Sequence, residues 1–94
     1  MKTLLGNFRS VEQVEGRSGP VRNQFIIYTD EGKVFQSYST IIAAKINGKV
    51  YLDRRKWDYS VTTGKYRNLF LGETKAETEK KIKSGVYTLE DLNE

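Results

Sequence analysis

The 94-residue sequence contains no cysteine and no histidine. Without cysteine the chain cannot form a disulfide or offer thiolate ligands, and without histidine it lacks the imidazole on which most zinc sites and Ser-His-Asp triads depend. No apolar run approaches the roughly 20 residues that a membrane-spanning helix needs. These absences remove the commonest metal and nucleophilic sites, and we expect no cofactor, no metal and no membrane partner.

The start of the chain, MKTLLGNF, has an apolar patch that is too short for a signal peptide. Ninety-four residues are enough for one domain with a modest core. Gly16, Ser18, Gly19 and Pro20 give the region before the core many turn-forming residues. We therefore expect a cytoplasmic protein with a mixed, partly flexible segment over residues 1–23 and a single domain over residues 24–94.

Positive charge is concentrated in residues 54–72, which hold five cations and one acid, Asp58, while the chain as a whole has a net charge of +4. Trp57, Tyr59 and Tyr66 are interleaved with these cations. Such a stretch is typical of a surface for an acidic partner, either nucleic acid or an acidic protein face. The predicted partner-binding residues are Arg54, Arg55, Lys56, Tyr59, Lys65 and Arg67. A purely structural interpretation also stands, in which Trp57 belongs to the core and the cations form a solvated face.

Residues 24–53 have the pattern of an antiparallel β-meander. QFIIYT and KVFQSYST are rich in β-branched and aromatic residues, and Asp30-Glu31-Gly32 separates them as a short turn. Asn47-Gly48 is a strong signal for a type I′ hairpin turn, because both central positions need positive φ. Residues 8–14 are consistent with an edge strand. An open meander leaves edges that can pair with another strand, so a homodimer is one possibility.

The pattern becomes helical after Asp53. Ser60 is the expected N-cap of a helix over residues 61–71, and Gly72 suits its C-terminal end. Thr74 and Glu77 have the spacing of a capping box for a second helix, which Gly85 ends. The fold class is therefore predicted to be α+β, with a meander of three to five strands and one or two C-terminal helices packed on it.

Catalytic motifs are weak throughout the sequence. Gly64-Lys65 resembles part of a phosphate-binding loop, but Tyr59 and Tyr66 stand where the Walker A pattern needs Gly and Ser or Thr. Asp53 and Asp58 flank the RRKW segment, and we interpret them as a strand end and an arginine partner rather than a carboxylate site. We predict that the protein is not an enzyme.

The run VFQSYSTIIAAKINGKVYLDRRKWDYSVTTGKYRNLFLGETKAETEKKIKSG resembles a family of small uncharacterised domains of bacteriophages and prophages. The resemblance covers about residues 24–92 and rests on the patterns F-x-S-Y-x-[ST]-x-I-A, W-D-Y-S-x-T-T-x-K-Y and F-L-G. Their positions here are Phe35, Ser37, Tyr38, Thr40, Ile42 and Ala43; Trp57 to Ser60, Thr62, Thr63, Lys65 and Tyr66; and Phe70, Leu71 and Gly72. It implies a phage-type setting inside a host cell and carries over no catalytic residue.

Together these features favour a non-catalytic, phage-encoded protein that inhibits a host protein or protein–nucleic-acid complex, in concrete terms an anti-CRISPR or other anti-defence inhibitor in the host cytoplasm. The alternatives are a module that binds nucleic acid directly through residues 54–67 and a small nucleotide-signal binder at a dimer interface. Three polar or aromatic residues of the second pattern are secondary candidates for the contact surface: Thr62, Thr63 and Tyr66.

Overall fold

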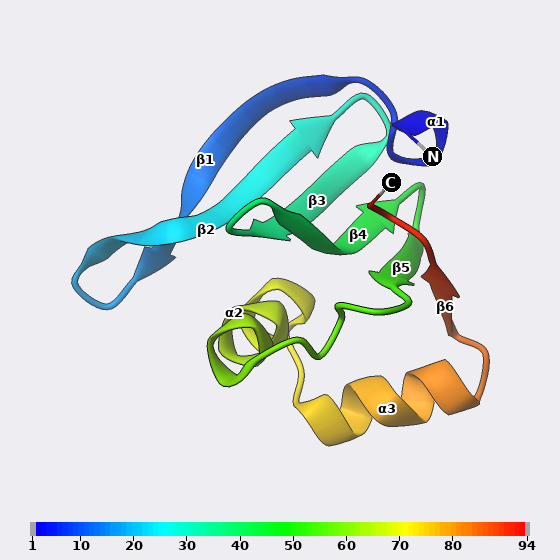
Figure 1. Ribbon diagram of the computed structural model, residues 1–94. Helices are drawn as coiled ribbons and strands as arrows, with labels where there is room; N and C mark the ends of the chain where they lie inside the picture. Colours follow the sequence, from blue (N-terminus) through cyan, green and yellow to red (C-terminus); the bar gives the residue numbers. More distant parts are fainter. Residues whose placement is uncertain (1, 94) are drawn as a thin grey trace.

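The computed structural model describes residues 2–93, and their side chains from Leu4 onward. Five strands, two longer helices and a final strand follow one helical turn at the start, and the α+β class agrees with the sequence prediction. The elements are α1 (Lys2–Leu5), β1 (Phe8–Gly16), β2 (Gly19–Thr29), β3 (Gly32–Ser37), β4 (Thr40–Ile46), β5 (Lys49–Asp53), α2 (Val61–Leu71), α3 (Lys75–Lys83) and β6 (Tyr87–Glu90). Figure 1 shows their arrangement.

The strands form one sheet in the order β1-β2-β3-β4-β5-β6. Strands β1 to β5 are antiparallel neighbours, whereas β6 runs parallel to β5. A parallel neighbour needs a long crossover, and α2 and α3 supply it. The prediction of three to five strands was therefore too low. The parallel pairing of β6 depends on contacts between residues nearly 40 positions apart, such as Tyr51 with Thr88, which a local pattern does not reveal.

The expected edge strand near the N-terminus is present as β1, and it extends beyond residue 14. A tight turn at Arg17 and Ser18 leads into β2, with Gly16 paired to Gly19. β2 continues through residue 23. The boundary expected between residues 1–23 and residues 24–94 therefore lies inside a strand of the common sheet. Figure 1 shows the β1–β2 hairpin curling away from the other strands.

The turns of the meander follow the predicted chemistry. Asn47 and Gly48 have φ values of 50° and 81°, as a type I′ turn requires. Gly32 follows the Asp30-Glu31 turn at a φ of 158°, and a Cβ there would lie 1.9 Å from the carbonyl oxygen of Lys45. Only glycine lets β3 and β4 approach so closely at this point.

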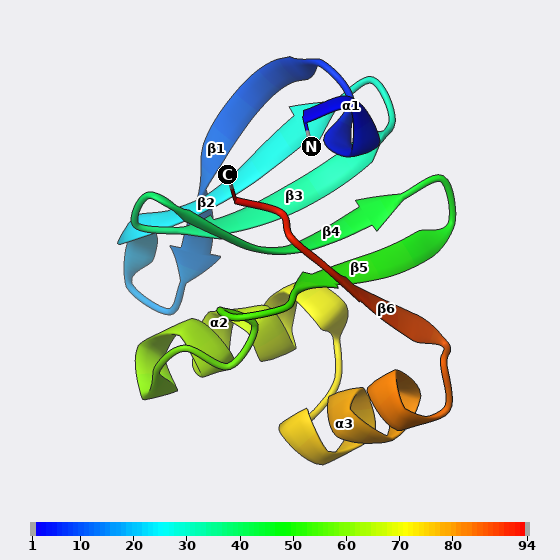
Figure 2. The same cartoon turned by 45° about the vertical axis from the view of Figure 1, so that its right-hand side comes forward.

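The two faces of the sheet bury different sets of apolar side chains. One face packs against α2 and α3, and its buried residues are Phe35, Ile42, Ala43, Leu52 and Tyr87. The other face packs against α1 and the C-terminal tail, and its buried residues are Leu5, Ile27, Val34, Ile41, Ala44, Ile46 and Leu92. In Figure 2 the tail after β6 crosses the sheet next to β4. Asn93 holds it there, because its side chain both accepts from and donates to the backbone of Ile41.

Local capping sets the ends of both crossover helices as the sequence predicted. The Ser60 side chain accepts a hydrogen bond from the backbone N–H of Thr63, and Gly72 ends α2 in the left-handed conformation. Thr74 and Glu77 form the reciprocal capping box of α3. These capping hydrogen bonds are short-range, so the ends of α2 and α3 can be recognised from the sequence alone.

Candidate functional site

The candidate site is the segment after β5, and a buried carboxylate shapes its first turn. One Asp53 oxygen accepts hydrogen bonds from the backbone N–H groups of Arg55 and Lys56, at 3.2 and 2.9 Å. The other accepts from Leu92 at 2.8 Å and so ties the C-terminal tail to the same turn. Asp53 therefore ends its strand as expected, and its oxygens are engaged by backbone donors.

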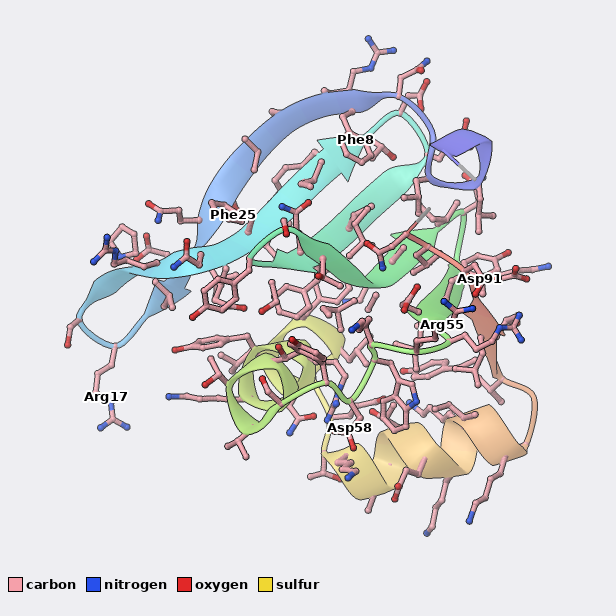
Figure 3. All side chains as sticks on the ribbon, viewed as in Figure 1. Phe8, Arg17, Phe25, Arg55, Asp58 and Asp91 are labelled. Atoms are coloured by element: carbon pink, nitrogen blue, oxygen red, sulfur yellow. The ribbon has the colours of Figure 1, made fainter. Side chains whose placement is uncertain are left out.

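Arg54 and Arg55 leave this turn in exposed positions. The Arg54 guanidinium lies 3.5 Å from Asp91 and donates to the Leu89 carbonyl at 3.3 Å. Arg55 is exposed as well, and Figure 3 shows it beside β5 and β6. The acid at Asp91 offsets part of the charge of Arg54 and leaves Arg55 as the stronger candidate for an external contact.

Half-buried Lys56 and exposed Tyr59 form a second part of this segment. The Lys56 ammonium lies 4.5 Å from the centre of the Tyr59 ring, within the range of a cation–π interaction. The tyrosine is 60% exposed. A large aromatic ring held open to solvent beside a cation is the kind of group that contributes strongly to macromolecular interfaces.

Arg67 does not belong to the exposed surface, although the sequence analysis grouped it with the other cations. Only 1% of its surface is accessible. Its guanidinium donates to the Trp57 carbonyl at 2.8 Å, to Asp58 at 3.2 Å and to the Asn68 side chain at 2.9 Å. It also lies 5.1 Å from the centre of the Trp57 ring, and Trp57 itself packs against the core. Arg67 thus fastens the loop before α2 to the body of the domain.

Asp58 completes this connection. It accepts from buried Arg67 and also pairs with Lys75 at 2.7 Å, so it joins the loop to α2 and to the start of α3 (Figure 3). Burial alone would raise the pKa of Asp58, but hydrogen bonds from Lys75 and Arg67 outweigh it and hold the pKa below its usual value. The pairing of Asp58 with an arginine agrees with the structural interpretation of this acid.

An open hollow of about 720 Å³ lies where the loop, α2 and the start of α3 meet. Lys65 lines it together with Asp58, Arg67 and Lys75. Of these residues, Lys75 was not among the residues considered for a site from the sequence. Lys75 stands beyond the cationic stretch, so composition gave no signal for it. The hollow brings Lys65 and Arg67 together, while Arg54, Arg55, Lys56 and Tyr59 do not line it.

The three secondary candidates have different environments. Thr62 is exposed on the first turn of α2. Thr63 is 1% exposed, and its hydroxyl lies 3.1 Å from that of buried Ser37 and 3.2 Å from that of Ser60. Tyr66 is half-buried against the core, with the Lys65 ammonium 5.3 Å from its ring centre. Of the three, Thr62 alone presents an open side chain, and Thr63 anchors α2 to β3.

Gly64 weakens α2, and its replacement provides a test of the packing around Arg67. A Cβ at this position would meet only the Arg67 guanidinium, at 3.6 Å or more, which is ordinary van der Waals contact. Alanine is favoured over glycine inside a helix by roughly 1 kcal/mol. We expect Gly64→Ala to raise the free energy of unfolding by about 0.5–1 kcal/mol, measured by urea denaturation. A loss of stability would show instead that the Arg67 side chain cannot adjust to the added methyl.

Over residues 2–93, no group of three or more Asp or Glu side chains is placed to hold a metal ion. Within the same residues, no helix is long and apolar enough to cross a membrane.

Comparison with known proteins places the chain in a family. The sequence model of a family of unknown function (DUF8033) matches residues 10–85, and the chain belongs to that family. No curated protein and no solved structure matches the chain.

Proposed function

We propose that this member of the family is a non-catalytic binding protein that contacts a macromolecular partner through a basic–aromatic surface, defined as Arg54, Arg55, Lys56, Tyr59 and Lys65. The observation that carries the proposal is the exposed Tyr59 ring with the Lys56 ammonium beside it, in the same segment as exposed Arg55. Tyrosine and arginine are enriched among the residues that dominate binding energy at protein interfaces.

The charge balance of this surface indicates an acidic partner. Of the two aspartates in residues 53–58, Asp53 is buried and Asp58 is paired with Arg67 and Lys75. Only Arg54 among the surface cations has an ion pair with an acid in the described part of the chain, and that pair is with Asp91. The remaining positive charge faces solvent and would attract an acidic surface over a range of about 8–10 Å at physiological salt.

The host setting follows from the resemblance to phage domains and gives the proposal its concrete form. The protein would act as an inhibitor by occupying the acidic surface of a host protein or protein–nucleic-acid complex, such as an anti-defence or anti-CRISPR target. No chemistry is required of the protein in this role, which is consistent with the structural use of Asp53 and Asp58.

A second candidate is direct binding of nucleic acid, and the exposure of Tyr59 is the observation that favours it. An open aromatic ring can stack a base of a single strand, while Arg55 and Lys65 would contact phosphates. The two candidates differ in their response to salt. Neutralising several phosphates makes the logarithm of the affinity fall steeply with the logarithm of the salt concentration, whereas a mixed protein interface is less sensitive.

A charge reversal tests the surface itself. We expect Arg55→Glu combined with Lys65→Glu to weaken partner binding by at least about tenfold, because attraction becomes repulsion. The measurement is a pull-down from bacterial host lysate, with and without nuclease, followed by titration of the captured partner. Arg17→Glu is the matched control, since it reverses an exposed charge in the β1–β2 turn, at the other end of the molecule (Figure 3).

The outcomes separate the candidates. A protein that is retained after nuclease and lost with the double variant supports the inhibitor. Partners that disappear with nuclease support the nucleic-acid module. Equal capture by the double variant and by Arg17→Glu would reject the basic–aromatic surface in both forms.

A further inference from the structure

Two lysines face each other across β3 and β4. Lys33 pairs directly with Lys45 in the antiparallel register, so both side chains leave the same face of the sheet. Like charges placed directly opposite one another destabilise a sheet. Among the side chains that the structure describes, neither ammonium has an ion pair with an acid. The fold therefore maintains a local repulsion, which the charge of Glu73 offsets only in part.

These lysines lie at a cleft between α2 and the first three strands, with a volume of about 310 Å³. Lys33 lines the cleft directly, and the Lys45 ammonium lies 4.9 Å from the centre of the Phe70 ring, which forms part of the wall. The other apolar lining residues are Val14, Ile26, Tyr66 and Leu69. Leu69 is 60% exposed, so one apolar side of the cleft is open to solvent.

The opposite wall is acidic and hydrogen-bonding. Glu12 and Glu15 of β1 line it, and the Tyr28 hydroxyl donates to Glu12 at 2.9 Å. The cleft thus has a cationic end, an apolar middle and an end that accepts hydrogen bonds. That order of groups matches a ligand that has an anion at one end and a ring with N–H donors at the other.

The environment of Lys45 disfavours its charged form. Burial lowers the pKa of Lys45 and the charge of Lys33 lowers it further, while the charge of Glu73 raises it in part. Groups whose protonation is disfavoured by both burial and a like charge gather at functional sites, where a ligand of the opposite charge relieves the repulsion.

We propose that this cleft binds a nucleoside monophosphate. The phosphate lies between the Lys33 and Lys45 ammonium groups, and the base packs against Phe70 and Leu69. Glu12 accepts from an exocyclic amino group of the base. Small-molecule pockets span about 300–1,000 Å³, so the volume suits a single nucleotide better than a dinucleotide. None of the five residues of the basic–aromatic surface lines the cleft, and the proposal is independent of the partner proposed above.

The test is calorimetric titration of the whole protein with AMP, GMP, CMP and UMP, and with inorganic phosphate and adenosine alone. We expect at least one mononucleotide to bind, and to bind more tightly than either phosphate or adenosine. Lys45→Met keeps the length of the side chain beside Phe70 and removes its charge, and it should weaken that binding by at least about tenfold. Lys49→Met is the matched control, because Lys49 is exposed and leaves the opposite face of the sheet, opposite Ile46.

A stability measurement tests whether Lys45 has only a structural role. Without ligand, Lys45→Met should melt within a few degrees of the wild type, because the variant removes the repulsion from Lys33 together with the cation–π contact to Phe70 and retains the packing of the stem. A much lower melting temperature for Lys45→Met would assign this residue to packing and reject the site. The site is equally rejected if no mononucleotide binds, if phosphate alone binds as tightly, or if Lys45→Met binds like Lys49→Met.

Discussion

Replacing Arg67 with methionine should lower the free energy of unfolding by about 3 kcal/mol, because it removes one partner of a buried, hydrogen-bonded charge network. The guanidinium is 1% exposed and connects the Trp57 carbonyl, Asp58 and Asn68 at once. Methionine fills similar space but supplies no donor, so the Trp57 carbonyl loses its 2.8 Å bond and Asp58 keeps only Lys75. For a domain of this size, such a loss should lower the melting temperature by more than about 10 °C.

Arg54→Met is the control for this prediction, since both arginines belong to the same cationic stretch. The ion pair of Arg54 with Asp91 is more than half exposed on both sides, and exposed pairs contribute about 0–1 kcal/mol. Arg67→Lys should recover little of the loss, because one ammonium cannot reach three acceptors in the plane of the guanidinium. Equal melting temperatures for Arg67→Met and Arg54→Met would contradict the role that burial assigns to Arg67.

The helices could be predicted from the sequence because their signals are local. Ser60, Gly72, Thr74 and Glu77 act on backbone groups within a few residues, and each was placed correctly. The Asn47-Gly48 turn is predictable for the same reason, since two adjacent φ values decide it. Features of this kind need no knowledge of the rest of the fold.

The sheet was predicted less completely because its edges depend on distant partners. Most of β1 is exposed, so the strand shows little apolar alternation. β6 has only four residues, and it is recognisable as a strand once β5 lies parallel beside it. The helices that make this pairing possible were predicted, but their role as a crossover to a parallel final strand was not.

The candidate site shows the same limit. A charged residue is exposed by default, and on that basis the sequence grouped Arg67 with Arg55 and Lys65. Its burial arises because the Trp57 carbonyl and the Asp58 carboxylate of the loop before α2 accept hydrogen bonds from the guanidinium. The Lys33–Lys45 pairing is likewise a property of strand register, which isolated residues do not display.

Glu73→Gln should lower the free energy of unfolding at neutral pH by about 2 kcal/mol, since the Glu73 carboxylate joins the segment after α2 to both α3 and β6. Glu73 lies between α2 and α3, and its side chain is only 5% exposed. One oxygen accepts from Lys81 at 2.7 Å and from the Tyr87 hydroxyl at 2.9 Å, and the other accepts from Thr78 at 2.6 Å. A glutamine is neutral and has one acceptor oxygen, so Lys81 loses its ion pair and the three donors share one acceptor in place of two.

The same substitution should change how stability depends on pH. Burial alone would raise the pKa of Glu73, but hydrogen bonds from Lys81, Thr78 and Tyr87 outweigh it and hold the pKa below its usual value. A depressed pKa in the folded state adds stability above the unfolded pKa of about 4.3, and that stability is lost as the pH falls through the folded value. The difference in the free energy of unfolding between wild type and Glu73→Gln should therefore be largest at pH 7 and decrease steadily below about pH 4.

Urea denaturation from neutral to acidic pH measures both effects, with Glu79→Gln as the control. Glu79 is exposed on α3, so its replacement should change stability by less than about 0.5 kcal/mol. Asp58 also has a depressed pKa and is intact in both proteins, so both should lose some stability in acid. The Glu73 carboxylate makes the free energy of unfolding of the wild type fall more steeply with decreasing pH. Parallel pH profiles for wild type and Glu73→Gln would show that the Glu73 carboxylate interacts equally in the folded and unfolded chains, and that the junction between α2, α3 and β6 is held by apolar packing alone.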